Sequence, residues 1–151
     1  MTFNTVTGGT ATTSYVTTAT ASTYLGTKPL LNWQSAWSSV SSTTQQKLLM
    51  EATRRVDAFP FQGKKEAPTQ ALQFPRAWFA SSTIPTRLQN AVCEEAFSIL
   101  NGGSQSKRDA QDGVASQSLG GESVTYNAKQ RRLDSEEAYI LLQPYIQKRL
   151  K

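Results

Sequence analysis

GKKEAPTQALQFPRAW, residues 63–78, is a loop that lies between two segments with helical patterns, and this unit decides the fold. On both sides of the loop, apolar residues recur three and four positions apart, which is the spacing of one helix face. Polar and charged residues occupy the positions between them. We therefore predict two long core helices, over about residues 43–59 and 86–101, joined by a structured loop.

The ends of these helices carry recognisable signals. Ser42 and Gln45 have the spacing of a capping box, which places the start of the first helix one residue after Ser42. Pro60 disfavours helical geometry at the residue before it and ends that helix. Pro85 suits the first turn of the second helix, and Gly102 can adopt the left-handed conformation that ends it.

Five residues form the structural motif that we expect to hold the loop in place. Gln70 offers both a donor and an acceptor to loop backbone groups, and Phe74 can fold back over the helix pair. Pro75 stiffens the loop. Arg76 and Asp57 are expected partners, because a guanidinium can bind a carboxylate and nearby carbonyls together. A structural role for this pair is preferred over ligand binding.

The N-terminal region is low in charge and rich in threonine. Residues 1–13 cannot bury enough apolar surface to order themselves, so we predict a flexible arm followed by a single domain over residues 14–151. An alternative is that Phe3 and Val6 anchor the arm as an added strand on a neighbouring subunit. Two short helical patterns, before and after Lys28, precede the core helices.

The C-terminal region contains a hairpin pattern and a further helix. Residues 114–127 form two extended segments around a Gly-Gly turn, and a lone hairpin needs support from the domain or from a neighbour. The last helix is expected over about residues 135–150, with Asp134 and Glu137 as a capping box and a break near Gln143 caused by Pro144. The fold class is thus mainly α, a small helical bundle with a protruding β-hairpin.

Composition limits the chemistry that this chain can perform. It has no histidine and a single cysteine, Cys93, so it has neither a Ser-His-Asp set nor a plausible zinc set. We predict no enzymatic activity, no catalytic or metal-binding residues and no cofactor. The sequence lacks a membrane-spanning stretch and a signal-peptide pattern, which favours a soluble protein of a reducing cytoplasm.

The net charge of +5 is unevenly distributed. Lys28 is the single charged residue among residues 1–46, whereas residues 129–151 carry a basic surplus. Lys64 and Lys65 form a basic tip on the loop. Such a surface favours nucleic acid or an acidic protein partner, although a basic surplus of this size also serves solubility alone.

The run from Glu51 to Arg76 resembles the head-to-tail connector (adaptor) proteins of tailed bacteriophages, a family also labelled DnaT-like single-stranded-DNA-binding proteins. The element TQALQFPR, residues 69–76, is the most specific part of this resemblance, and weaker similarity covers most of the chain. The matching residues are Ala52, Thr53, Arg54, Asp57, Gly63, Gln70, Ala71, Leu72, Phe74, Pro75 and Arg76. The chain departs from the family pattern in its threonine-rich arm and in the PFQG segment after the first core helix.

The resemblance implies a structural virion protein of the phage neck, assembled in the host cytoplasm. Subunits would form a homo-oligomeric ring, usually a dodecamer, between the portal protein and a stopper or tail-completion protein, with packaged DNA passing through the lumen. By this analogy the C-terminal segment would dock on the portal through Tyr145, Ile146, Lys148, Arg149, Leu150 and Lys151. Basic side chains that would face the DNA lumen are Lys64, Lys65 and Arg108.

Two other classes of function remain open. A single-stranded-DNA-binding protein requires aromatic residues interleaved with basic residues in an exposed groove, for which the nearest candidates are Arg76, Trp78, Phe79 and Arg87. A head-decoration or minor capsid protein is the third possibility.

Overall fold

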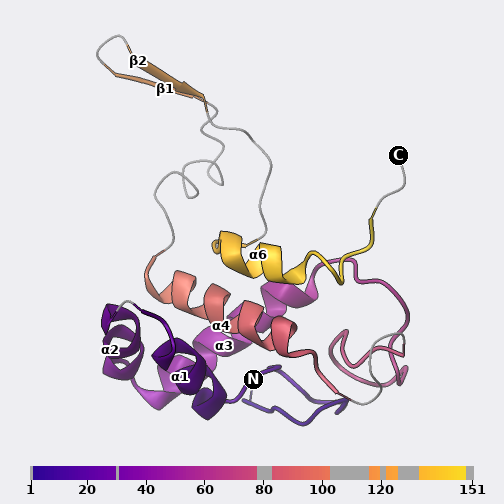
Figure 1. Ribbon diagram of the computed structural model, residues 1–151. Coiled ribbons are helices and arrows are strands. Elements are labelled where there is room, and N and C mark those ends of the chain that lie inside the picture. Colours follow the sequence, from indigo (N-terminus) through magenta and orange to yellow (C-terminus); the bar gives the residue numbers. More distant parts are fainter. Residues whose placement is uncertain are drawn as a thin grey trace.

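Five helices and a two-stranded ribbon form the part of the chain that the computed structural model describes, residues 2–29, 31–77, 83–102, 116–119, 122–125 and 133–148. The elements, in chain order, are α1 (Thr18–Gly26), α2 (Leu31–Ser39), α3 (Ser42–Asp57), α4 (Thr86–Leu100), β1 (Ser116–Leu119), β2 (Glu122–Thr125) and α6 (Glu136–Leu142). The fold is mainly α and packs as a small bundle (Figure 1), which confirms the predicted fold class.

Helix α4 is the centre of the bundle. It packs against α3 on one side and against α6 on the other, and α1 and α2 cover one end of the pair (Figure 1). Its apolar stripe is fully buried at Leu88, Val92 and Ala96, as the sequence pattern predicts. Gly102 follows the helix with a φ of 77°, and its N–H donates to the carbonyl of Ile99 at 3.0 Å. A left-handed residue therefore ends α4, as predicted.

The start of α3 differs from the prediction by one residue. Ser41, rather than Ser42, is the N-cap, and its hydroxyl accepts a hydrogen bond from the Thr44 N–H at 3.2 Å. The Gln45 amide, expected to close a capping box, instead donates to the Trp37 carbonyl at 2.8 Å. This bond ties α3 to the end of α2, so tertiary contact determines the cap.

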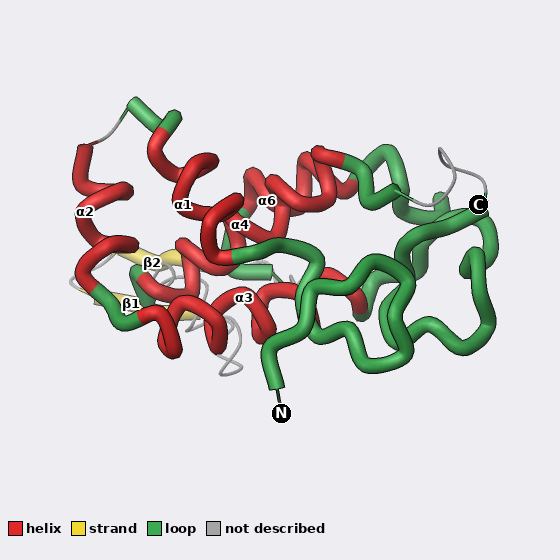
Figure 2. Tube along the Cα trace, turned by 90° about the horizontal axis from the view of Figure 1, so that it is seen from below, coloured by secondary structure: helices red, strands yellow, loops and turns green. Residues whose placement is uncertain are grey.

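Residues 2–13 lie against their own domain, which differs from the expected flexible arm. The N–H groups of Thr13 and Ser14 donate to the Asn4 carbonyl at 2.9 and 3.1 Å, which closes the segment into a loop. The Ala71 N–H donates to the Gly9 carbonyl at 3.0 Å, and Phe3 packs on the core. Seen from below, this segment and the α3–α4 loop occupy one end of the molecule, away from α2 (Figure 2).

The ribbon and the C-terminal helix are shorter than predicted. Strands β1 and β2 are antiparallel and pair Leu119 with Glu122, the register of a two-residue connection; the remaining residues of the predicted 114–127 hairpin lie outside the described residues. The ribbon stands apart from the helices (Figure 1). Helix α6 ends at Leu142, and Ile146 then pairs with Phe61 in an antiparallel bridge. The predicted helix over 135–150 is therefore too long, while the break near Gln143 is found.

The start of α6 also differs from the predicted capping box. Ser135 caps the helix by accepting from the Ala138 N–H at 3.2 Å, and Asp134 instead forms an ion pair with Arg55. Among the helices described, none is both long and apolar enough to cross a bilayer.

Candidate functional site

The loop between α3 and α4 is held by extended pairing with two other segments. Phe61 bridges Ile146 of the C-terminal segment, and Lys65 bridges Arg76 further along the same loop. The Gln62 N–H donates to the Tyr145 carbonyl at 2.8 Å, which strengthens the first of these pairings. Backbone pairing therefore connects the loop both to itself and to the segment that follows α6.

Arg76 is the main polar anchor of this loop. The side chain is 6% exposed, and its guanidinium donates to the Phe61, Gln62 and Gly63 carbonyls as well as to the Gln73 side chain. The Nε bond to the Gln62 carbonyl is 2.6 Å long, and the Nη1 bond to Gln73 Oε1 is 2.8 Å long. Arg76 thus fixes the beginning of the loop to its end. The direct pairing with Asp57 that the sequence suggested is not among these bonds, which is a correction to the predicted role.

Gln70 and Phe74 supply the second set of anchors. Gln70 Oε1 accepts from the Ala67 N–H at 3.0 Å, while its amide donates to the Leu72 and Pro75 carbonyls at 2.9 and 3.0 Å. The Phe74 ring is buried, and three aromatic rings meet it edge-on, those of Tyr15, Phe61 and Tyr145. The peptide bond between Phe74 and Pro75 is cis.

Asp57 bonds with Tyr15 and the loop backbone instead of with Arg76. The Tyr15 hydroxyl donates to Asp57 and accepts from the Phe74 N–H at 3.1 Å, and the Gln73 N–H donates to Asp57 at 2.8 Å. Burial raises the pKa of the Asp57 carboxyl, and burial together with the neighbouring Asp57 raises the pKa of the Tyr15 hydroxyl. Sequence reasoning did not identify Tyr15, because no local spacing connects it with Asp57.

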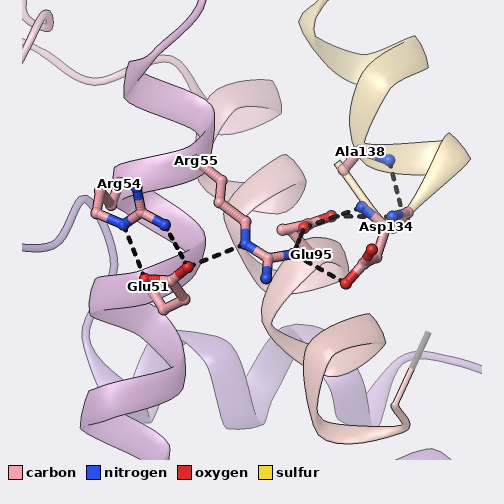
Figure 3. A network of polar contacts seen from close by, with 7 residues as sticks. Glu51, Arg54, Arg55, Glu95, Asp134 and Ala138 are labelled. Carbon is pink, nitrogen blue, oxygen red and sulfur yellow. Dashed lines mark hydrogen bonds and ion pairs between the residues drawn. The ribbon is translucent and has the colours of Figure 1, made fainter. Parts of the chain in front are cut away.

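A second buried network joins the three main helices (Figure 3). Glu95 on α4 is fully buried, and it accepts from Arg55 of α3 at 3.0 Å. It also accepts from the backbone N–H groups of Asp134 and Ser135, at 3.0 and 2.9 Å, immediately before α6. Arg55 in turn donates to Asp134 at 2.8 Å and to Glu51 at 3.1 Å. One buried carboxylate therefore fixes the start of α6 to the α3–α4 pair.

Glu94, the residue before Glu95, forms a separate ion pair on another side of α4. It is 2% exposed, pairs with Lys28, and accepts from the Tyr24 hydroxyl at 2.6 Å. The Lys28 ammonium lies 4.8 Å from the Tyr24 ring centroid and 5.5 Å from that of Trp33. The sequence pattern did not predict that Glu94 and Glu95 are buried. Their position within an otherwise apolar helix stripe was the available signal.

Titration of Tyr24 offers a test of this ion-paired cluster. Burial, followed by the hydrogen bond to Glu94, raises the pKa of Tyr24 from 10.0 to about 12, while Lys28, which faces the same carboxylate, has its own pKa raised. The folded state holds the Tyr24 proton more tightly, so this contribution to stability is complete below pH 10 and is lost as the pH rises towards 12.

The variant Tyr24→Phe is therefore expected to be less stable at neutral pH by about 1 kcal/mol, because it lacks the bond to Glu94. It should also lose stability less steeply than wild type under alkaline conditions. Free energies of unfolding from urea titrations across the alkaline range measure both effects. Identical slopes for the two proteins would contradict the assignment.

The predicted interface residues occupy different environments. Lys64 is exposed at the loop tip, whereas the Lys65 ammonium donates to the Gln70 carbonyl at 3.3 Å. Tyr145 and Ile146 are packed within the domain and do not form a free tail. Lys148 is exposed. The other proposed lumen and docking residues, Arg108, Arg149, Leu150 and Lys151, lie outside the described residues.

The described tryptophans support packing rather than a base-stacking platform. Trp37 is 1% exposed, and the Trp33 ring stacks on Phe97 with 3.9 Å between centroids. Trp78 and Phe79, named as candidates for stacking on bases, lie outside the described residues. Within the described ranges, His, Cys, Asp and Glu side chains form no group of three or more suited to a metal ion.

The described residues thus form a small helical bundle with a projecting two-stranded ribbon. The chain belongs to the family described as "Putative DnaT-like ssDNA binding protein", whose family model matches residues 1–150. No curated protein and no solved structure matches the chain. The family description agrees with the label attached to the resemblance and favours single-stranded DNA binding over the connector hypothesis.

Proposed function

We propose that this protein is a non-catalytic structural subunit that forms a ring in the neck of a tailed bacteriophage. The ring would lie between the portal and a stopper or tail-completion protein and leave a lumen for DNA. The observation that carries the proposal is the β1–β2 ribbon, which stands apart from the bundle (Figure 1). An isolated two-stranded ribbon is marginally stable in water, so contact with another subunit would stabilise it.

The locked loop supports the same role. The carbonyl bonds of Arg76 and the ring contacts of Phe74 hold residues 61–77 in one conformation, and this is the region of the connector resemblance. A preorganised loop loses little conformational entropy when it enters an interface. In this proposal Lys64 faces DNA or the next ring, while Lys148 and the residues after it contact the portal.

Co-sedimentation with purified portal rings tests this function. Wild-type protein is expected to sediment with the portal, and a variant lacking residues 149–151 with Lys148→Glu should lose most of this association. This variant retains Tyr145 and Ile146, which the domain needs for packing. Arg87→Glu, at an exposed position of α4, is the matched charge control and should bind like wild type. Absence of wild-type association at several salt concentrations would contradict the connector role.

Single-stranded DNA binding is the second candidate function, and the specific observation in its favour is the family description over residues 1–150. This function predicts that the affinity for a labelled single-stranded oligonucleotide falls steeply with salt and exceeds the affinity for duplex DNA. Binding of the oligonucleotide should also quench the tryptophan fluorescence of the protein. Weak binding that does not distinguish single strands from duplex would contradict it.

A further inference from the structure

The chain that follows α6 lies along the first part of the α3–α4 loop. Ile146 forms an antiparallel bridge with Phe61. Beside this bridge, the Gln147 N–H donates to the Pro60 carbonyl at 2.8 Å. Backbone groups make these contacts, so residues 145–147 pair with the loop in the manner of an added strand. We call residues 145–147 the latch.

Gln62 holds the latch on the other side of the bridge, through both its backbone and its side chain. Its N–H donates to the Tyr145 carbonyl at 2.8 Å, and its side-chain amide donates to the Ile146 carbonyl at 2.9 Å. The Tyr145 ring also meets the buried Phe74 ring edge-on, with 6.0 Å between the ring centroids. The latch therefore contacts the loop both near its start and further along it.

Arg76 binds the carbonyls of the same stretch of the loop. Its Nε donates to the Gln62 carbonyl at 2.6 Å, and its Nη2 donates to the Phe61 carbonyl at 3.2 Å. Gln62 therefore bonds with the latch through its N–H and with Arg76 through its carbonyl. A shift of Gln62 would disturb both sets of bonds.

Two backbone hydrogen bonds close the tip of the loop on either side of Arg76. The Glu66 N–H donates to the Pro75 carbonyl at 3.1 Å. The Ala77 N–H donates to the Lys64 carbonyl, also at 3.1 Å. The tip, Arg76 and the latch thus belong to one continuous set of hydrogen bonds.

The connection between α6 and the latch allows the latch to move without the helix. Helix α6 ends at Leu142, and the two residues that follow, Gln143 and Pro144, are exposed. Pro144 has no N–H group that would need a new partner after such a movement. The buried residues Ala138 and Leu142 would keep α6 on the core.

We propose that the latch and the α3–α4 loop open and close as one unit, so that drawing the latch away from the domain releases the loop tip. A partner that binds residues 145–147 as an extended strand would compete with the loop for the same backbone groups. By linkage, opening of the loop would favour release of the latch by the same factor. The inference goes beyond the proposed function, because all of these contacts lie within one chain.

Amide hydrogen exchange of the protein alone tests this coupling, since amides that open in one unit share the same opening free energy. The variant Gln62→Ala removes the side-chain bond to the Ile146 carbonyl and keeps the backbone bonds. Loss of one hydrogen bond corresponds to about a two- to tenfold change in the opening equilibrium. Gln143→Ala removes the same type of side chain at the exposed end of α6 and is the matched control.

Four amides report the result. Gln147 reports the latch, and Glu66 and Ala77 report the loop tip. Val92, which is fully buried on α4, reports opening of the whole domain. In Gln62→Ala, the latch and loop-tip amides are expected to exchange faster than in wild type by one common factor, about two- to tenfold, while Val92 keeps its wild-type rate. Gln143→Ala should leave all four rates unchanged.

Two results would overturn the proposal. If Gln62→Ala accelerated exchange at Gln147 alone, the latch would open independently of the loop tip. If the rate at Val92 rose by the same factor as the others, the latch and the loop would open only together with the whole domain. Because the measurement needs no portal protein and no DNA, neither result would decide between the two candidate functions.

Discussion

Replacing Glu95 by alanine is expected to lower the free energy of unfolding by about 3–5 kcal/mol. Glu95 is fully buried, and it bonds with Arg55 and with the backbone N–H groups of Asp134 and Ser135. Its removal leaves two donors without their acceptor and takes one of three carboxylate partners from Arg55. Urea titration followed by circular dichroism measures the loss.

Glu51→Gln is the matched control for this prediction. Glu51 belongs to the same network (Figure 3), but its side chain is 36% exposed, so water can replace its bonds to Arg54 and Arg55. A loss below about 1 kcal/mol is expected for an exposed pair of this kind. If Glu95→Ala and Glu51→Gln lowered the free energy of unfolding equally, burial would not determine how much each carboxylate contributes to stability.

Arg76→Met is expected to cause the second large loss, about 3 kcal/mol or more, because it leaves several loop carbonyls without their donor. The reason is the geometry of Arg76, which bonds with the carbonyls of Phe61, Gln62 and Gly63 from one planar group. Arg76→Lys keeps the positive charge but lacks the planar set of N–H donors that the guanidinium offers. It should therefore recover only a small part of the lost free energy of unfolding. Free energies of unfolding from denaturant titrations give both values.

Lys64→Met is the control on the same loop. Lys64 is exposed at the tip, so its replacement should change the free energy of unfolding by less than about 0.5 kcal/mol. If Arg76→Lys were as stable as wild type, the positive charge and not the hydrogen bonds of the guanidinium would explain the role of Arg76. That result would contradict the proposed anchoring of the loop.

The sequence predicts α3 and α4 well because each of these two helices buries one regular stripe. The apolar spacing around Leu88 and Val92 locates α4, and Pro144 predicts the end of α6. The caps were less predictable, since Ser41 and Ser42 are equally suited as isolated residues. The Gln45 bond to the Trp37 carbonyl favours the earlier start, and it depends on how α2 packs.

The hydrogen-bond partners of the buried polar side chains, in contrast to the helices, could not be predicted from the sequence. The motif identifies Gln70 and Arg76 as important, but not the atoms that they bind. Asp57 bonds with Tyr15, 42 residues earlier in the chain, and Glu95 bonds with the backbone of Asp134, 39 residues later. Such pairings arise when helices pack together, and no local spacing specifies them.

Under the connector proposal, electron microscopy of the protein mixed with the portal rings of its phage tests the central claim most directly. The portal alone and the protein alone serve as references. The connector proposal predicts an additional ring layer, coaxial with the portal, in the mixture. Unchanged portal rings in the mixture, together with tight salt-sensitive binding of single-stranded DNA, would contradict the connector proposal and favour the DNA-binding function.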